Sequence, residues 1–247
     1  MYGSRRLLAA RVAEWAALAG IPILTALRTH FPAPQTPTDL AQFLLLTLHA
    51  NYAGAVVALA LMGLVGRVAQ HLLGAERKNR IKAVLDTLDE ALFRDVPGEA
   101  RYQNRATLFR ANYRQTRLKL YCRAGTWYQA ARPQLAIDGN NEQRNQGVGG
   151  QAWFRNTMLD VWDLPDCPVP CVATNQTCVD YAARGFMDLE RTAKLHVRSR
   201  SLLAVVVRDS AGRKWGALCV DRRDPLRFSA EQRALTSAFA TAIGKMV

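Results

Sequence analysis

The longest apolar stretch of the chain runs from Leu40 to Gly66 and contains no Asp, Glu, Lys or Arg. As a helix it would be about 40 Å long, which exceeds the roughly 30 Å hydrocarbon core of a bilayer. A helix of this length in a soluble protein would carry charged residues on its solvent face. The pattern therefore predicts a transmembrane helix.

A shorter apolar segment precedes it, from Val12 to Leu27, with Glu14 near one end and Pro22 inside. Basic residues precede the first segment and follow the second, and cationic flanks belong on the cytoplasmic side. We therefore expect residues 1–66 to form a transmembrane helical hairpin in the inner (plasma) membrane, with both termini cytoplasmic. For the first segment, the alternative is a signal peptide or a helix lying in the membrane interface.

Small residues recur at every fourth position of the long segment, at Ala50, Gly54 and Ala58. A stripe of small side chains lets another helix approach closely. It predicts a helix-packing face in the membrane and hence a homo-oligomer. Chance recurrence in an alanine-rich segment is the alternative.

Residues 67–95 form a basic segment in which apolar residues recur at helical spacing. Lys and Arg crowd its first half, where each contributes about 1 kcal/mol near an anionic membrane surface. The spacing predicts an amphipathic connecting helix that packs on its own domain, pairs with a second copy, or does both. The apolar positions are Ile81, Val84, Leu85, Leu88 and Leu92.

Residues 96–247 change to the alternation of apolar and polar residues that is typical of strands. It occurs in RATLFRANY, RLKLYCRAG, SLLAVVVRD and KWGALCVDRR, and the last two are joined by the hairpin signal Ser-Ala-Gly. The tail SAEQRALTSAFATAIGKMV predicts an amphipathic helix that opens with a capping box of Ser229 and Gln232. This order predicts an α+β domain in which helices flank an antiparallel sheet.

Four segments in this order resemble the GAF domain family. They are GVGGQAW at 147–153, LDVWDLP at 159–165, SLLAVVV at 201–207 and WGALCVDRRDPLRFSAEQRAL at 215–235. The resemblance implies a GAF-like antiparallel sheet with flanking helices, and a cytoplasmic sensor domain over 96–247. It also implies a ligand pocket between the sheet and the segments at roughly 150–200.

Aromatic and charged residues of that stretch are the ligand-binding candidates that the resemblance implies. Aromatic faces with an Arg and an Asp suit a purine or a cyclic nucleotide. The family's cyclic-nucleotide signature is not visible in the sequence, and a core role for the aromatic residues is the alternative. The candidates are Trp153, Trp162, Asp163, Phe186, His196 and Arg198.

The glycine-rich stretch from Gly147 to Gly150 raises the question of phosphate binding. No Gly-Lys-Ser/Thr follows it, so it is not a P-loop. We expect Gly147, Gly149 and Gly150 to adopt positive φ and to let a helix begin tightly at Gln151.

The chain has five cysteines, and an odd number argues against a disulfide framework. Cys167, Cys171 and Cys178 fall in one short segment. They are a weak candidate for a zinc or iron–sulfur site with His196 as fourth ligand, because no C-x-x-C pair is present. Incidental loop thiols are the other interpretation, and no cofactor is identified.

An enzymatic activity is not expected from the residues. No Ser-His-Asp or paired-carboxylate constellation stands out. GAF proteins that reduce free methionine sulfoxide typically carry a cysteine where this chain has Gly149. Such an enzyme, or a cysteine-based redox or metal sensor, is the alternative to a ligand sensor.

The net charge of +13 predicts an anionic neighbour. Because basic residues crowd the predicted membrane segment, the membrane accounts for part of this charge and nucleic acid is disfavoured. We expect a membrane-anchored GAF-type sensor that binds a small ligand and signals to or through its transmembrane helices. A nucleotide second messenger is one candidate for this ligand. The layout is similar to membrane-disrupting effectors of bacterial antiviral nucleotide signalling.

Overall fold

The computed structural model describes residues 2–30, 40–96, 101, 104–125, 134–168, 171–172, 174–193 and 199–247. The chain divides into two compact units, Met1–Glu76 and Arg77–Val247. The boundary lies inside the segment that the sequence predicts to be a connecting helix. Each unit is described by itself.

The first unit contains helix α1 (Tyr2–His30) and the first part of helix α2 (Leu40–Phe93). Both helices are long and apolar enough to cross a membrane, judged by length and composition. Only 11% and 6% of their most apolar windows are buried within the chain, whereas the core helix of a soluble protein is mostly buried. This low burial is consistent with the predicted hairpin.

Small residues bring α1 and α2 together. A Cβ added at Gly63 would lie 2.8 Å from the Cβ of Ala17, and one at Gly66 would lie 2.7 Å from the carbonyl oxygen of Ala10. The predicted stripe of small residues takes no part in this contact, because its three residues are exposed and no atom lies within 4 Å of a Cβ added at its glycine. A role of that stripe between chains stays a prediction. Its residues are Ala50, Gly54 and Ala58.

Glu14 also links the two helices of the hairpin. Its Oε2 accepts a hydrogen bond of 2.7 Å from Nε2 of Gln70, and its Oε1 lies 3.3 Å from Nε of Arg67. The one acidic residue of the first apolar segment therefore has polar partners on α2.

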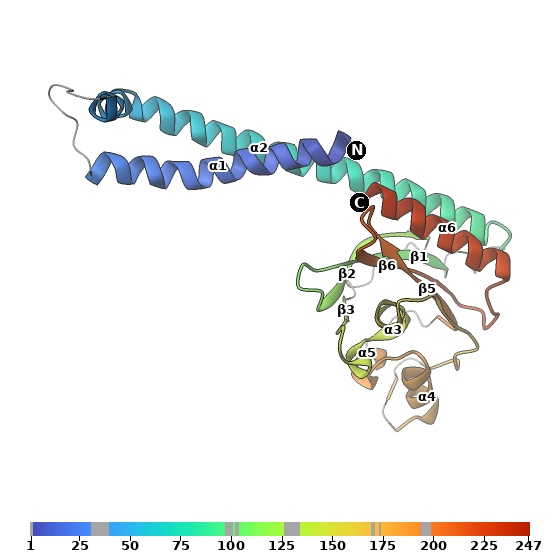
Figure 1. The fold of residues 1–247 in the computed structure, drawn as a ribbon. Coiled ribbons are helices and arrows are strands. Elements are labelled where there is room, and N and C mark those ends of the chain that lie inside the picture. The colour runs from blue at the N-terminus through green and yellow to red at the C-terminus, as the bar shows by residue number, and fades with distance from the viewer. Residues whose placement is uncertain are drawn as a thin grey trace. The chain divides into compact units, whose positions relative to one another are not determined.

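The second unit is built on a six-stranded antiparallel sheet in the order β3-β2-β1-β6-β5-β4 (Figure 1). The expected α+β fold is confirmed, including the predicted hairpin of the last two strands. The strands are β1 (Arg105–Ala111), β2 (Arg117–Gly125), β3 (Gln134–Ala136), β4 (Leu159–Val161), β5 (Ser201–Arg208) and β6 (Lys214–Arg222).

One face of this sheet packs against the C-terminal part of α2 and against α6 (Ala230–Met246) (Figure 1). Leu108 and Leu218 of the sheet belong to the same buried cluster as Leu85 of α2 and Ile243 of α6. The apolar positions of the predicted connecting helix thus pack on their own domain. The predicted capping box is present, with Ser229 Oγ accepting from the Gln232 amide and Gln232 Oε1 accepting from the Ser229 amide.

The other face of the sheet is covered by α3 (Gly147–Arg155), which packs on β5 and β6 (Figure 1). Two expectations for the glycine stretch are wrong. The helix begins at Gly147 rather than at Gln151, and only Gly147 of the three glycines has positive φ, at 66°. Gly149 serves close packing instead, since a Cβ there would lie 2.7 Å from Sγ of Cys219.

Three shorter helices complete the description. They are the 3-10 turn η2 (Glu142–Arg144), α4 (Gln176–Arg184) and α5 (Leu189–Ala193).

Candidate functional site

A cavity of about 120 Å³ lies within the second unit, on the α3 side of the sheet. Strands β1, β2, β5 and β6 supply part of its wall, and Gly147 and Gly149 of α3 supply another part. Apolar side chains line most of it, including Phe109, Leu135, Met187 and Leu202. The polar side chains at the cavity are Arg105, Thr107, Arg123, Tyr181, Ser199 and Asp221.

Arg105 and Asp221 form an ion pair at this cavity. The two residues face each other in the β1–β6 register, and Nε of Arg105 donates to Oδ2 of Asp221 at 2.7 Å. Burial lowers the pKa of Arg105, but the adjacent Asp221 carboxylate outweighs this and the net shift is upward. The other oxygen, Oδ1 of Asp221, is buried without a hydrogen-bond partner among the described residues.

Arg123 is the second cation of the cavity. Its Nε donates to Oγ1 of Thr107 at 3.2 Å, and within the described part of the chain no ion pair is found for it. Burial lowers the pKa of Arg123, and the positive charge of Arg105 lowers it further. The fold therefore holds an arginine where its charge is disfavoured, which an anionic ligand group would relieve.

Ser199 supplies a buried hydroxyl to the same cavity. Its carbonyl oxygen accepts a hydrogen bond of 2.8 Å from the hydroxyl of Tyr181 on α4. Its own Oγ has no partner among the residues that the structure describes, although Ser199 is only 2% exposed. A buried hydroxyl without a partner costs free energy, so this site favours a ligand that completes the bond.

Cys219 places a thiol in the cavity wall, beside Gly149. Burial raises its pKa to about 12, with a smaller contribution from the charge of Asp221. The thiol is thus protonated at neutral pH, and a protonated thiol is a poor nucleophile.

Two of the predicted ligand-binding residues belong to the packing between α3 and the sheet: Trp153 of α3 is buried there, and Phe186 is half-buried against the same cluster. Trp153 is 2% exposed, and Nζ of Lys214 lies 5.6 Å from its ring centroid. The guanidinium of Arg155 lies 5.5 Å from the centroid of the Phe186 ring. Neither residue lines the cavity.

The other two described candidates, Trp162 and Asp163, are exposed. The Trp162 ring stacks under the guanidinium of Arg227 at 4.1 Å, and Asp163 lies 3.7 Å from Arg200. Neither lines the cavity, so for Trp153, Trp162, Asp163 and Phe186 a ligand-binding role stays a prediction. His196 and Arg198 lie outside the described residues.

Sequence reasoning missed the polar residues that do line the cavity. Four of them sit on strands, at positions whose side chains share a face with the buried cluster that includes α3 residues: Arg105, Thr107, Arg123 and Asp221. The sequence did offer a signal for this polar site, namely charged residues at inward positions of apolar strands. Such a charge needs a partner when it is buried.

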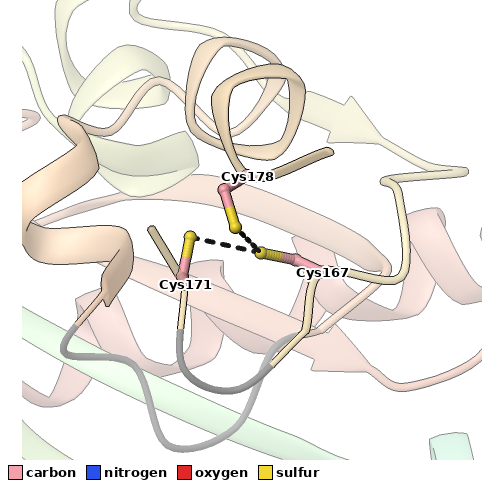
Figure 2. A group of neighbouring side chains, drawn as sticks. All are labelled: Cys167, Cys171 and Cys178. Carbon is pink, nitrogen blue, oxygen red and sulfur yellow. Dashed lines mark hydrogen bonds between the residues drawn. The ribbon is translucent and has the colours of Figure 1, made fainter. Parts of the chain in front are cut away.

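The predicted cysteine cluster forms a second feature of the unit. Sγ of Cys167 lies 3.4 Å from Sγ of Cys171 and 3.2 Å from Sγ of Cys178 (Figure 2). All three residues are buried, and Cys178 comes from α4. The three thiols converge on one another, which the spacing alone did not establish.

Several solved structures are similar to this chain at low identity. A free methionine-R-sulfoxide reductase from Thermoplasma acidophilum is 16% identical over 69% of this chain and 94% of its own, with a TM-score of 0.42. A methyl-accepting chemotaxis protein fragment is 17% identical over 70% and 93%, with a TM-score of 0.43. The GAF domain of an Acinetobacter phosphoenolpyruvate-protein phosphotransferase is 15% identical over 70% and 92%, with a TM-score of 0.38.

No curated protein matches the sequence. The family described as the GAF domain matches residues 64–247, which include all six strands and the helices on both faces of the sheet. This match agrees with the resemblance carried by the glycine stretch and the final strand and helix. The chain belongs to the GAF domain family.

Proposed function

We propose that the protein is a membrane-anchored sensor whose GAF cavity binds a small zwitterion of amino-acid size. One observation carries the proposal: two buried oxygens that have no hydrogen-bond partner among the described residues share a cavity with Arg123, namely Oδ1 of Asp221 and Oγ of Ser199. A ligand with an acidic group, a donor group and a short apolar body would satisfy all of them.

The charges of the cavity define the two ends of such a ligand. The carboxylate end would pair with Arg123, whose guanidinium offers several donors in one plane. The ammonium end would donate to Oδ1 of Asp221, because Arg105 occupies only the other oxygen. Ser199 Oγ is available to either end, since a hydroxyl both donates and accepts.

The volume of the cavity further limits the class of ligand. Its volume of about 120 Å³ is close to that of an engineered cavity of roughly 150 Å³ that binds benzene. Sites for drug-sized ligands measure about 300–1,000 Å³, and a nucleotide needs room of that order. The proposal is therefore an amino acid or a similar small molecule, in place of a nucleotide second messenger.

The signal would pass through the sheet to α2. Residues alternate along β1, so Arg105 and Thr107 line the cavity while Ala106 and Leu108 pack with Leu85 of α2 on the opposite face. A ligand that moves β1 would thus change how α2 packs on the sheet. Since α2 runs from Leu40 to Phe93, we propose that it carries this change toward the apolar segment.

The apolar parts of α1 and α2 are proposed to span the inner membrane. Their apolar side chains are exposed in the single chain, Trp15, Leu61 and Val65 among them, as lipid contact requires. Basic residues such as Arg77 and Lys78 then lie at the cytoplasmic surface. The Ala50, Gly54 and Ala58 stripe is the proposed contact with a second copy.

Sensing is favoured over catalysis by the chemistry of the cavity thiol. A sulfoxide reductase needs a nucleophilic thiolate next to the substrate, but burial raises the pKa of Cys219 to about 12. The adjacent position in α3 is Gly149, which offers no second thiol. We therefore propose binding without turnover.

Thermal unfolding of the full chain in detergent micelles tests the proposal. The probes are the standard amino acids, their amine-only and carboxylate-only analogues, and cyclic nucleotides. A ligand at 100 times its Kd adds about 2.7 kcal/mol, which raises Tm by several degrees. We expect that rise from at least one amino acid and from neither of its two analogues. Stabilisation by cyclic nucleotides alone would refute the proposed ligand class.

A further inference from the structure

We propose that Cys167, Cys171 and Cys178 together bind one zinc ion. The Sγ atoms of all three lie within 4.8 Å of one another, and the cysteines are 4%, 5% and 0% exposed. Figure 2 shows the three thiols pointing at a common centre, two of them from the loop before α4 and one from α4 itself. This metal site is separate from the ligand cavity and goes beyond the proposed sensing function.

The sulfur spacing fits a tetrahedral metal site better than a disulfide. Zinc–sulfur bonds of about 2.3 Å place tetrahedral ligands roughly 3.8 Å apart. The observed separations of 3.4 Å and 3.2 Å need to open by only a few tenths of an ångström. A disulfide of about 2.05 Å would join two of the sulfurs and leave the third beside it, so it does not explain why three converge.

The start of α4 favours the thiolate form that zinc requires. Asn175 caps this helix by accepting from the amide of Thr177, and Cys178 lies in its first turn. The amides at a helix N-terminus carry partial positive charge, which stabilises nearby anions. Binding of zinc would release the thiol protons, so its affinity rises with pH.

Three thiolates leave one position of a tetrahedral zinc ion for another ligand. Among the described residues, no fourth His, Cys, Asp or Glu joins the cluster. Water fills this position in zinc sites with three protein ligands. His196, the fourth ligand considered from the sequence, lies outside the described residues.

The site would hold the wall of the ligand cavity in place. The three cysteines form a small buried cluster with Leu164 and Tyr181, apart from the two larger clusters of the unit. Tyr181 also lines the cavity and donates to the carbonyl of Ser199. A cluster with so few apolar side chains stabilises α4 only weakly. A bound metal ion would add to the stability of α4 and of the cavity wall.

Metal analysis of the full chain, purified in detergent with a reductant and without chelator, tests this inference. We expect about one zinc per chain in the wild type, and loss of most of it in Cys167→Ser, Cys171→Ser and Cys178→Ser. Cys122→Ser is the matched control, because Cys122 is also a buried thiol but lies in β2 in the cluster under α6. It should keep the zinc.

Cobalt substitution keeps the test decisive if a serine variant fails to fold. Wild-type protein stripped of metal should take up one Co²⁺ and show the thiolate charge-transfer absorption of a tetrahedral site, which zinc then abolishes. Folded wild-type protein that takes up neither ion would overturn the inference, as would serine variants that retain zinc. Either result would leave the proposed amino-acid site unaffected, because metal content is measured in the absence of an amino-acid ligand.

Discussion

Arg105 occupies only one of the two carboxylate oxygens of Asp221. Its Nε donates to Oδ2 at 2.7 Å across the β1–β6 pair, while Oδ1 is buried without a partner among the described residues. A buried ion pair normally satisfies both oxygens, because the cost of removing a charge from water is otherwise not recovered. The incomplete pair is therefore the clearest mark of a ligand site in this domain.

The hydroxyl of Ser199 predicts that one substitution lowers ligand binding without lowering stability. Ser199→Ala removes a hydroxyl that has no partner in the described part of the chain, so the free energy of unfolding should stay the same or rise, while binding of the stabilising amino acid weakens. Ser201→Ala is the matched control, because its buried hydroxyl donates to the carbonyl of Asp224 at 2.9 Å. It should cost about 1 kcal/mol and leave binding intact. Denaturant titrations and binding assays of both variants check this, and equal effects of the two would contradict it.

Asp89 on α2 predicts a dependence of stability on pH. Burial raises its pKa from 3.8 to about 6; Arg101 partly offsets this and the charges of Asp86 and Glu90 add to it. The folded state thus binds the proton more tightly than the unfolded state. The stabilisation is complete below about pH 4 and is lost as pH rises through 6, by on the order of 2–3 kcal/mol.

Denaturant unfolding of the full chain between pH 4 and 7.5, followed by tryptophan fluorescence, measures this dependence. Asp89→Asn should flatten the slope that the wild type shows in that window. Asp95→Asn is the control, since Asp95 is an exposed carboxylate just beyond the end of the same helix. Identical slopes in wild type and Asp89→Asn would show that Asp89 titrates normally.

The contact between Gly149 and Cys219 predicts that substitution of Cys219 reduces the destabilisation caused by substitution of Gly149. Gly149→Ala should destabilise the domain by about 1–3 kcal/mol, because its Cβ would lie 2.7 Å from the sulfur. In a Cys219→Ala background the same change should cost much less, since the sulfur is gone. Gly139→Ala, where the added Cβ meets nothing within 4 Å, should be nearly neutral. A double-mutant cycle with no coupling energy would disprove the packing role of Gly149.

The exposed apolar surface of α2 predicts integral membrane association. The chain should stay with the membrane pellet through alkaline carbonate extraction, and a reporter fused after Val247 should be active in the cytoplasm. Leu61→Arg should reduce insertion, because an arginine at the centre of a span costs about 3 kcal/mol. A wild-type chain that fractionates as soluble without detergent would rule out the anchor.

The fold was predictable from the sequence because alternation and helical spacing report burial directly. RATLFRANY and RLKLYCRAG became β1 and β2, and the tail became α6 with its capping box. These patterns are local, so each can be recognised without knowing what packs against it.

The cavity was not predictable, because it depends on strand register. Arg105, Arg123 and Asp221 are far apart in the sequence and meet only through the pairing of β1 with β2 and β6. The aromatic candidates were chosen for ligand stacking, but Trp153 packs from α3 into the buried cluster against the sheet and Trp162 stacks with Arg227. The cysteines were noticed from their spacing, yet their convergence depends on how the loop returns to α4.

Calorimetric titration of wild type and Arg123→Gln with the most stabilising amino acid tests the central claim most directly. Removing Arg123 should not harm the fold, because burial and Arg105 already disfavour its charge. The wild type should bind one ligand per chain, and Arg123→Gln at least roughly tenfold more weakly, since a charged hydrogen bond contributes about 1.5–3 kcal/mol. Equal affinity in the two proteins would contradict the assignment of this cavity as the ligand site.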